Sequence, residues 1–252
     1  MARVSVLVAM PLIGRDAALV AGWAAAVDAV AAEFPEATFT RCAAIRAGDD
    51  EAACACLAAG VETVTVAWYD LPSGARHNFG GVALKRVRLV RAAADRGAAV
   101  VWFVDADIRP LPSHWAAADA LFREGKPVVV VPYPVRWASG RRPVVCVATE
   151  AGLSLCDARS FEGLDGATSA IIAGGGMGCT AILTPVAALV RFSVASLALA
   201  EEPGGIMGED IAWFLNARQA GVEVRMPLGL VAEHVGAEAE PITPAGAEAD
   251  PH

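Results

Sequence analysis

Two carboxylates, Asp105 and Asp107, stand directly after a run of apolar residues, VVWFV at 100–104. Such a run predicts a strand buried on both faces, as in a parallel sheet covered by helices. In these sheets ligands bind at the carboxyl ends of the strands. Two anionic side chains at the edge of a dry core are costly unless a cation offsets their charge. The pair therefore predicts a divalent metal ion that carries a phosphorylated ligand, and a turn with Asp as a turn residue is the structural alternative.

A second pair of acids, Glu209 and Asp210, stands at the start of an amphipathic helix predicted over 209–220. Acids are common in a first helical turn, which is the structural interpretation. The functional one makes one carboxylate a general base, held in place by the rigid start of the helix. Near the end of the predicted core, His234 follows a short apolar stretch. A lone histidine is more often structural, but this imidazole can complete the metal site.

Two further segments carry residues that suit a phosphorylated ligand. The glycine-rich stretch GGGMG at 174–178 lets the backbone approach a ligand closely, or it forms a mobile linker. Asn78, Lys85 and Arg86 lie between the third predicted strand and the strand at 100–104. Either basic side chain can meet a diphosphate, and either can belong to a solvated helix face.

The elements that must position these residues alternate in the first half of the chain. Strands are predicted over 4–10, 38–45, 61–68 and 100–104, and helices over 16–33, from the acidic patch 49–51 through Cys56, and over 82–96. This order predicts a parallel sheet with right-handed crossovers. Further on, the patterns predict helices over 113–124, 185–199 and 209–220, and strands over 127–132, 143–148, 180–183, 222–227 and 230–232. Residues 149–176 match no regular pattern.

Composition narrows the class of protein. The 252 residues suit one α/β domain over 1–236, followed by a disordered acidic tail over 237–252. A net charge of −8 argues against a general binder of nucleic-acid backbones. The six cysteines show no CxxC spacing, so we expect ordinary buried thiols rather than a zinc site or disulfides. No apolar run approaches the ~20 residues of a transmembrane helix, and the N-terminal apolar run suits a strand, so we expect a soluble cytoplasmic protein.

The order and spacing of these motifs resemble the GT-A glycosyltransferases of the family-two type, including small bacterial and phage-like members. The stretch FVDADIRPLPSHWAAADALFREGKPVVVVPYPVRW is similar to their metal-site strand, the following helix and the next strand. NFGGVALKRVRLVRAAADRG is similar to their preceding helix, which commonly begins Asn-X-Gly and carries an Arg facing the donor. The resemblance covers about residues 3–236. It implies an α/β, Rossmann-like, mostly parallel central sheet flanked by helices, with a nucleotide-binding half (about 1–110) and an acceptor-binding half (about 111–236).

The resemblance also implies roles for the acids and the histidine. Asp107 would bind Mn²⁺ or Mg²⁺ directly, and Asp105 would meet the ribose or reach the metal through water. His234 would be a further metal ligand. Asp210 would be the base that deprotonates the acceptor hydroxyl, with Glu209 orienting the acceptor or the donor. The donor would be a nucleotide-diphosphate sugar, with a UDP-sugar favoured, and in-line displacement would invert the anomeric centre, although similar enzymes also retain it.

Other positions follow from the same resemblance. Pro11 would sit by the nucleotide base, Asn78 and Arg86 near the ribose and diphosphate. Gly175, Gly176 and Met177 would wall the donor sugar and acceptor. The chain departs from the family after the first strand, where PLIGRD replaces a Thr/Asn-rich nucleotide loop, and for residues 137–173 the resemblance provides no matching acceptor region. The acceptor is therefore open between a glycan, a protein and a modified nucleic-acid base.

Three alternatives compete with this interpretation. A sugar nucleotidyltransferase is also an α/β metal enzyme, but it usually begins with a Gly-rich signature that MARVSVLVAMPLIGRD does not offer. A phosphatase with an aspartyl nucleophile normally carries Asp-X-Asp after its first strand, whereas here the motif follows roughly the fourth. A non-catalytic module that binds a nucleotide or a sugar would keep Asp-X-Asp but would not need Asp210.

Overall fold

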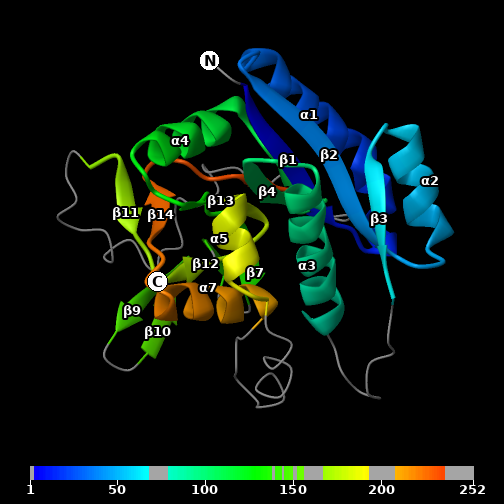
Figure 1. Ribbon diagram of the computed structural model, residues 1–252. Helices are drawn as coiled ribbons and strands as arrows, with labels where there is room; N and C mark the ends of the chain where they lie inside the picture. Colours follow the sequence, from blue (N-terminus) through cyan, green and yellow to red (C-terminus); the bar gives the residue numbers. More distant parts are fainter. Residues whose placement is uncertain are drawn as a thin grey trace, which may run out of the picture.

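A central eight-stranded sheet organises the computed structural model, which describes residues 3–67, 79–137, 140–143, 145–149, 152–155, 167–192 and 208–235. The strand order is β11-β14-β6-β13-β4-β1-β2-β3. Helices cover both faces of this sheet (Figure 1). The strands are β1 (Val4–Pro11), β2 (Ala37–Arg46), β3 (Glu62–Val66), β4 (Val100–Val104), β6 (Val128–Val130), β11 (Ser169–Ile171), β13 (Cys179–Leu183) and β14 (Val224–Pro227).

The strand directions bring several chain segments to one edge of the sheet. β1 pairs in parallel with β2 and β4, and β2 pairs in parallel with β3. β13 is antiparallel to both β4 and β6, so β4 and β6 run in the same direction. The carboxyl ends of β1, β4 and β6 and the start of β13 therefore lie at the same edge. The predicted α/β fold with a mostly parallel sheet is confirmed.

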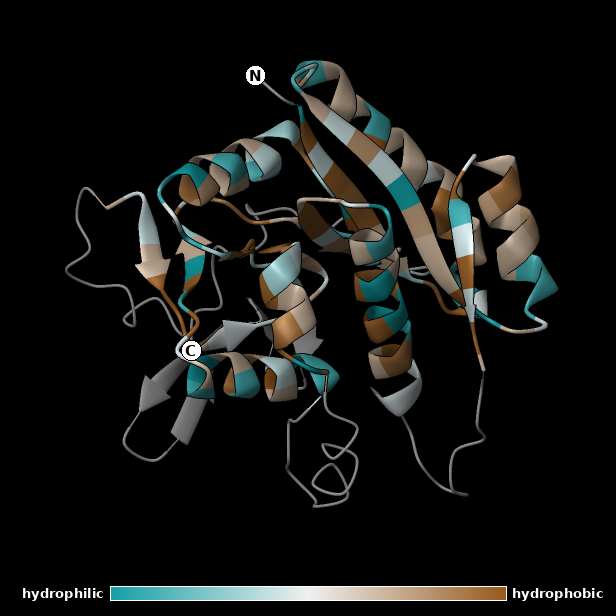
Figure 2. Ribbon diagram, viewed as in Figure 1, coloured by the Kyte–Doolittle hydropathy of each residue, from teal (hydrophilic) through white to brown (hydrophobic). Residues whose placement is uncertain are grey.

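Alternating side chains of the strands feed two separate hydrophobic layers. In β1, Val6, Val8 and Met10 face one layer, whereas Leu7 and Ala9 face the other. Figure 2 shows β1 as largely hydrophobic and α3 as mixed, in keeping with a buried strand and a helix with one exposed face. The first layer contains α1 (Val20–Glu33), α2 (Asp50–Ala58) and α4 (Pro112–Arg123); the second contains α3 (Phe79–Asp95), α5 (Thr184–Leu189) and α7 (Glu209–Gln219).

The remaining described strands pair in smaller sheets. β5 (Ile108–Arg109) pairs with β15 (Glu233–His234), and β7 (Pro134–Trp137) pairs with β8 (Gly140–Pro143). β9 (Val145–Thr149) pairs with β10 (Gly152–Leu155) and with β12 (Gly174–Gly175). These pairings place strands in the segment 149–176, for which the sequence predicted nothing.

Some predicted elements differ from the structure. Residues 230–232 are not a strand, because the pairing begins at Glu233, where the backbone meets β5. The helix predicted over 16–33 opens as a short 3-10 helix, η1 (Gly14–Leu19). The helix predicted over 185–199 ends at Leu189, since Val190 is extended and its carbonyl accepts a hydrogen bond from Trp213 Nε1 at 2.8 Å. Residues 193–199 of that prediction, and the tail 237–252, lie outside the described residues.

The described cysteines are free thiols, and four of them (Cys42, Cys56, Cys146, Cys179) are buried as predicted. Cys54 is the exception and is exposed, because it lies on the face of α2 away from the core. Within the described ranges, no helix combines the length and the apolar character that a membrane crossing requires.

Candidate functional site

Asp105 and Asp107 leave β4 at the edge where the strand ends meet. The Asp105 amide donates to the Gly178 carbonyl at 2.9 Å, which ties this turn to the segment entering β13. Burial raises the pKa of the Asp105 carboxyl, and Arg86 opposes that shift. The side chain nevertheless keeps 28% exposure, so an approaching ligand can reach it.

Asp107 and His234, 127 residues apart, form a close pair. His234 Nε2 lies 2.9 Å from Asp107 Oδ2, and the side chains are 20% and 36% exposed respectively. The Val235 amide also donates to the Asp107 carbonyl at 2.5 Å, so backbone pairing fixes the approach. His234 Nδ1 lies 2.8 Å from the Pro134 carbonyl, an arrangement that directs Nε2 toward Asp107. The hydrogen bond with Asp107 raises the pKa of His234.

Arg86 lies between Asp105 and Glu209 and forms an ion pair with each of them. Its Nη2 is 3.2 Å from Asp105 Oδ1, and its Nε is 3.2 Å from Glu209 Oε1. The guanidinium also stands over the Phe103 ring, 5.2 Å from its centroid. The residue is only 3% exposed. Its buried Nη1 nevertheless finds no hydrogen-bond partner among the described residues. An unsatisfied buried donor of this kind marks a place where a ligand oxygen or a water belongs.

The two acids of α7 have different surroundings. Glu209 is 5% exposed and paired with Arg86, and burial raises its pKa. Asp210 is only partly buried by its neighbours and accepts a 2.7 Å hydrogen bond from the Ile211 amide. Burial also raises the pKa of Asp210, against the hydrogen bonds from the backbone of Ile211 and Met177. Asp210 is therefore the more accessible of the two carboxylates, with a raised affinity for a proton.

The glycine-rich segment packs against protein atoms. A Cβ at Gly176 would lie 2.3 Å from the Tyr133 hydroxyl, and one at Gly178 would lie 2.8 Å from Asp105 Oδ2. Met177 between them is fully buried, and Gly175 pairs with Val145 of β9. The close packing around Asp105 and Tyr133 thus requires glycine, which has no Cβ atom, at positions 176 and 178. Contact of this segment with a donor sugar stays a prediction.

Gly176→Ala should destabilise the fold by about 1–3 kcal/mol, because the new methyl group overpacks a closed site. Gly22→Ala is the matched control. Its Cβ would meet only the flexible end of Arg109 at 3.1 Å, and alanine favours the helix, so we expect no loss. Urea denaturation of both variants measures the difference. Equal stability of Gly176→Ala and the unsubstituted protein would contradict the packing described here.

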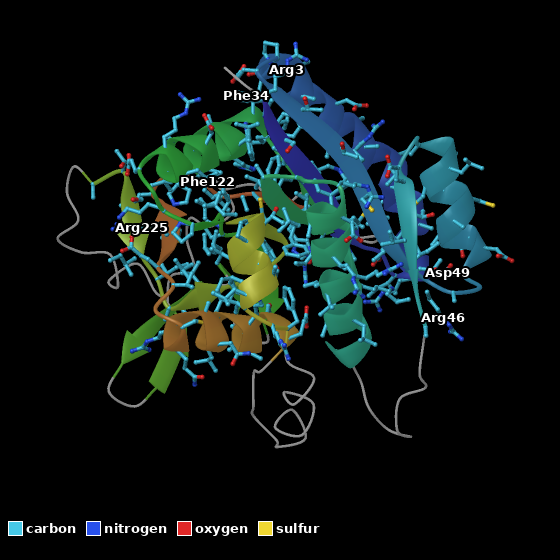
Figure 3. All side chains as sticks on the ribbon, in the orientation of Figure 1. Arg3, Phe34, Arg46, Asp49, Phe122 and Arg225 are labelled. Carbon is cyan, nitrogen blue, oxygen red and sulfur yellow. The ribbon has the colours of Figure 1, made fainter. Side chains whose placement is uncertain are left out.

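A cavity of about 520 Å³ opens beside the ends of β1 and β2. Lys85, which is 1% exposed, lines it and donates to the Leu12 carbonyl. Burial lowers the pKa of Lys85 to about 8, while Asp49 and Asp16 act to raise it. Asp49 also caps α2 by accepting from the Ala52 amide at 3.1 Å. Figure 3 places Asp49 and Arg46 close together at this end of the sheet, and the full lining is Ile13, Gly14, Arg46, Gly48, Asp49, Asp50, Glu51 and Lys85.

The remaining predicted positions fall as follows. Pro11 is buried at the end of β1, paired with Ala44, near the lining residue Ile13. Asn78 lies outside the described residues. The structure brings Asp105, Arg86 and Glu209 into direct contact, and it joins Asp107 to His234 as a separate pair. In the described part of the chain, no three His, Cys, Asp or Glu side chains form a group that could hold a metal by themselves.

Sequence reasoning missed two buried residues that support the site. Tyr133, whose hydroxyl accepts a hydrogen bond from the Gly178 amide at 3.3 Å, packs edge-on against His234. His114 accepts from the Leu111 amide at 3.1 Å through Nδ1 and also bonds the backbone of Val231, near His234. Burial lowers the pKa of His114 to about 4, so it stays neutral. The position of Tyr133 just after a buried strand was the available signal, since ligand sites lie at such ends.

Comparison with solved structures shows the fold alone. The chain resembles the crystal structure of A197 from STIV, with a TM-score of 0.50 and 14% identity over 96% of this chain and 91% of that one. It resembles a mycobacterial protein with a TM-score of 0.50 and 17% identity, over 93% and 68% of the two chains. A 4-diphosphocytidyl-2C-methyl-D-erythritol synthase from Anaerococcus prevotii gives 0.48 at 9% identity over 90% and 89%, too weak to support a conclusion.

Sequence comparison gives a nearer relationship. No family model matches the chain. A protein of African swine fever virus that is described as uncharacterized is 33% identical over 162 residues in the isolate Warthog/Namibia/Wart80/1980, and the match covers 60% of this chain and 66%, just under two thirds, of that protein. In the isolate Pig/Kenya/KEN-50/1950 the identity of the same viral protein is 31% over 163 residues, covering 60% of this chain and 67% of the relative. The chain therefore belongs to the same family as this uncharacterized protein of African swine fever virus.

Proposed function

We propose that this protein is a metal-dependent glycosyltransferase that moves a sugar from a nucleotide-diphosphate sugar, with a UDP-sugar favoured, to an acceptor hydroxyl. The observation that carries the proposal is the 2.9 Å approach of His234 Nε2 to Asp107 Oδ2, beside the carboxyl end of β4. The Asp107 carboxylate suits Mn²⁺ or Mg²⁺, and the His234 imidazole, whose other nitrogen faces a backbone carbonyl, would add a nitrogen ligand.

The residues present fit a metal that is shared with its ligand. Asp107 and His234 would hold it, and the phosphates and water would complete its coordination, as is usual for Mg²⁺. When bound, the metal supplies electrostatic stabilisation of the negative charge on the departing diphosphate. Asp105 would meet the ribose or the metal through water, which its partial exposure allows.

The protein groups then have distinct tasks. Among the residues that the structure describes, Arg86 Nη1 has no hydrogen-bond partner, which supports an oxygen-bearing ligand beside it, and Asp105 and Glu209 hold the guanidinium in place. Asp210 would take the proton of the acceptor hydroxyl as it attacks the anomeric carbon, while the sugar–phosphate bond breaks. The cavity lined by Lys85 and Asp49 is large enough for the nucleoside. The in-line geometry would invert the anomeric centre.

A thermal-shift screen of UDP-, GDP- and TDP-sugars with and without Mn²⁺ tests the proposal. A ligand that binds only the folded protein raises its melting temperature, so one nucleotide sugar should do so in a Mn²⁺-dependent way. Asp107→Asn should strongly reduce the Mn²⁺-dependent part of the shift, whereas Asp95→Asn, on an exposed residue at the end of α3, should keep it.

The products separate the proposal from the sugar nucleotidyltransferase. A glycosyltransferase releases a nucleoside diphosphate from the donor, whereas a nucleotidyltransferase releases pyrophosphate from a nucleoside triphosphate and a sugar phosphate. Pyrophosphate release would replace the proposal by that alternative. The absence of any metal-dependent shift with all of the nucleotide sugars would count against both.

A further inference from the structure

One buried side chain contacts both His234 and the glycine-rich segment. Tyr133 follows β6 and is 9% exposed. Its ring lies 5.7 Å from the His234 imidazole, centroid to centroid, at 72° to it. On the other side, its hydroxyl accepts a hydrogen bond from the Gly178 amide at 3.3 Å. The Asp107–His234 pair and the glycine-rich segment are therefore connected through the side chain of Tyr133.

The phenol also fixes how close the glycine-rich segment comes to Asp105. A Cβ at Gly178 would lie 2.9 Å from the Tyr133 hydroxyl and 2.8 Å from Asp105 Oδ2, so these oxygen atoms both face the same backbone carbon. The Gly178 carbonyl accepts from the Asp105 amide at 2.9 Å. Met177, the residue before it, contributes a backbone hydrogen bond to Asp210. A shift of the turn would consequently move the donor that orients Asp210.

The electrostatic surroundings keep the phenol protonated. Burial raises the pKa of Tyr133 well above its ordinary value, and Asp105 and Asp210 raise it further, whereas Arg86 and the Gly178 amide act to lower it. A phenol is already protonated at neutral pH, so the Tyr133 hydroxyl carries its proton. A neutral phenol can accept from the Gly178 amide and still has its own proton to donate.

We propose that Tyr133 is a positioning residue whose ring holds the His234 imidazole toward Asp107 and whose hydroxyl holds the Gly176–Gly178 turn in register with Asp210. This assignment rests on the proposed function for its effect on turnover, but its effect on metal binding does not need a nucleotide sugar. The ring and the hydroxyl act on different parts of the site, so two substitutions separate them.

Tyr133→Phe keeps the ring and removes the hydroxyl. We expect Mn²⁺ affinity within about twofold of the unsubstituted protein and a fall in kcat of about tenfold or more for the nucleotide sugar found in the screen, with little change in KM, in line with the loss of a supporting group. Tyr133→Leu removes the ring as well. We expect it to weaken Mn²⁺ binding by about tenfold or more, because the imidazole loses the surface that orients it.

Phe122→Leu is the control for the loss of an aromatic ring. Phe122 packs against Trp115, with ring centroids 6.4 Å apart, on α4 in the first hydrophobic layer. This variant should lower the melting temperature while Mn²⁺ affinity and kcat stay unchanged. The Mn²⁺ affinities of these variants are measured with Mn²⁺ alone, from the electron paramagnetic resonance signal of the free ion.

The outcomes distinguish this assignment from the proposed function. Mn²⁺ binding by Tyr133→Leu that equals the unsubstituted protein overturns the ring's role, whether or not a donor is found. A kcat for Tyr133→Phe equal to that of the unsubstituted protein overturns the hydroxyl's role. A protein that binds Mn²⁺, loses that binding in Tyr133→Leu and accepts no nucleotide sugar supports the positioning role while contradicting glycosyl transfer.

Discussion

Asp210→Asn is expected to lower kcat by at least about a hundredfold, the usual effect of removing a general base. The amide has almost the shape of the carboxylate and can keep the hydrogen bonds from the Ile211 and Met177 backbone. It cannot take a proton from an attacking hydroxyl. Release of the nucleoside diphosphate, with water or an identified acceptor, measures the rate. Donor binding, followed by the Mn²⁺-dependent thermal shift, should change by less than about twofold, since the carboxylate of a general base acts on the acceptor.

The pH profile gives this prediction its sign. A base must be deprotonated to act, and burial raises the pKa of Asp210 above its ordinary value. The rate should therefore fall as the pH falls through that raised pKa, and the fall should begin at a higher pH than for an exposed aspartate. With enough Mn²⁺ to keep the metal site saturated at each pH, the residual rate of Asp210→Asn should lose this acidic limb.

Glu209→Gln is the neighbouring comparison. Glu209 is buried and paired with Arg86, so its substitution weakens the pairing that holds the guanidinium. We expect a loss of stability and a smaller loss of kcat than in Asp210→Asn. If Asp210→Asn turned over the donor at the rate of the unsubstituted protein while Glu209→Gln did not, Glu209 would take the role of the base.

Local patterns were sufficient for the central elements. The apolar run of β4 required burial on both faces, and the turn after it could only lie at a strand end, so the location of Asp105 followed from the sequence. The same holds for α7, whose start was marked by two acids and a glycine. These features depend on residues near one another in the chain, where periodicity and capping preferences act directly.

The contacts between distant segments were beyond local patterns. The pairing of β15 with β5 joins segments about 125 residues apart, and the sequence pattern favours a strand at 230–232 instead, since three apolar residues there satisfy it. Burial of Arg86 between Asp105 and Glu209 depends on three elements arriving together. Sequence also could not show that Tyr133 occupies the space where Cβ atoms on Gly176 and Gly178 would lie, because the two segments are more than 40 residues apart.

His234→Ala is expected to weaken Mn²⁺ binding by at least about tenfold, since removing even the supporting groups of a metal ligand costs about 10–100-fold. Asp107→Asn should have a comparable effect. Because both side chains would hold the same ion, the double variant should lose less than the product of the two single losses. A titration of the protein with Mn²⁺, read from the resonance of the free ion, gives these affinities without any nucleotide sugar.

The pH dependence of Mn²⁺ binding identifies the histidine as the ligand. The metal must displace the proton from His234, whose pKa is raised by its hydrogen bond with Asp107. Affinity should therefore fall as the pH falls through that raised pKa, and the dependence should flatten in His234→Ala. If His234→Ala bound Mn²⁺ as tightly as the unsubstituted protein throughout this pH range, the 2.9 Å contact between His234 and Asp107 would be an ordinary ion pair of the fold. That result would contradict the proposed metal-dependent mechanism.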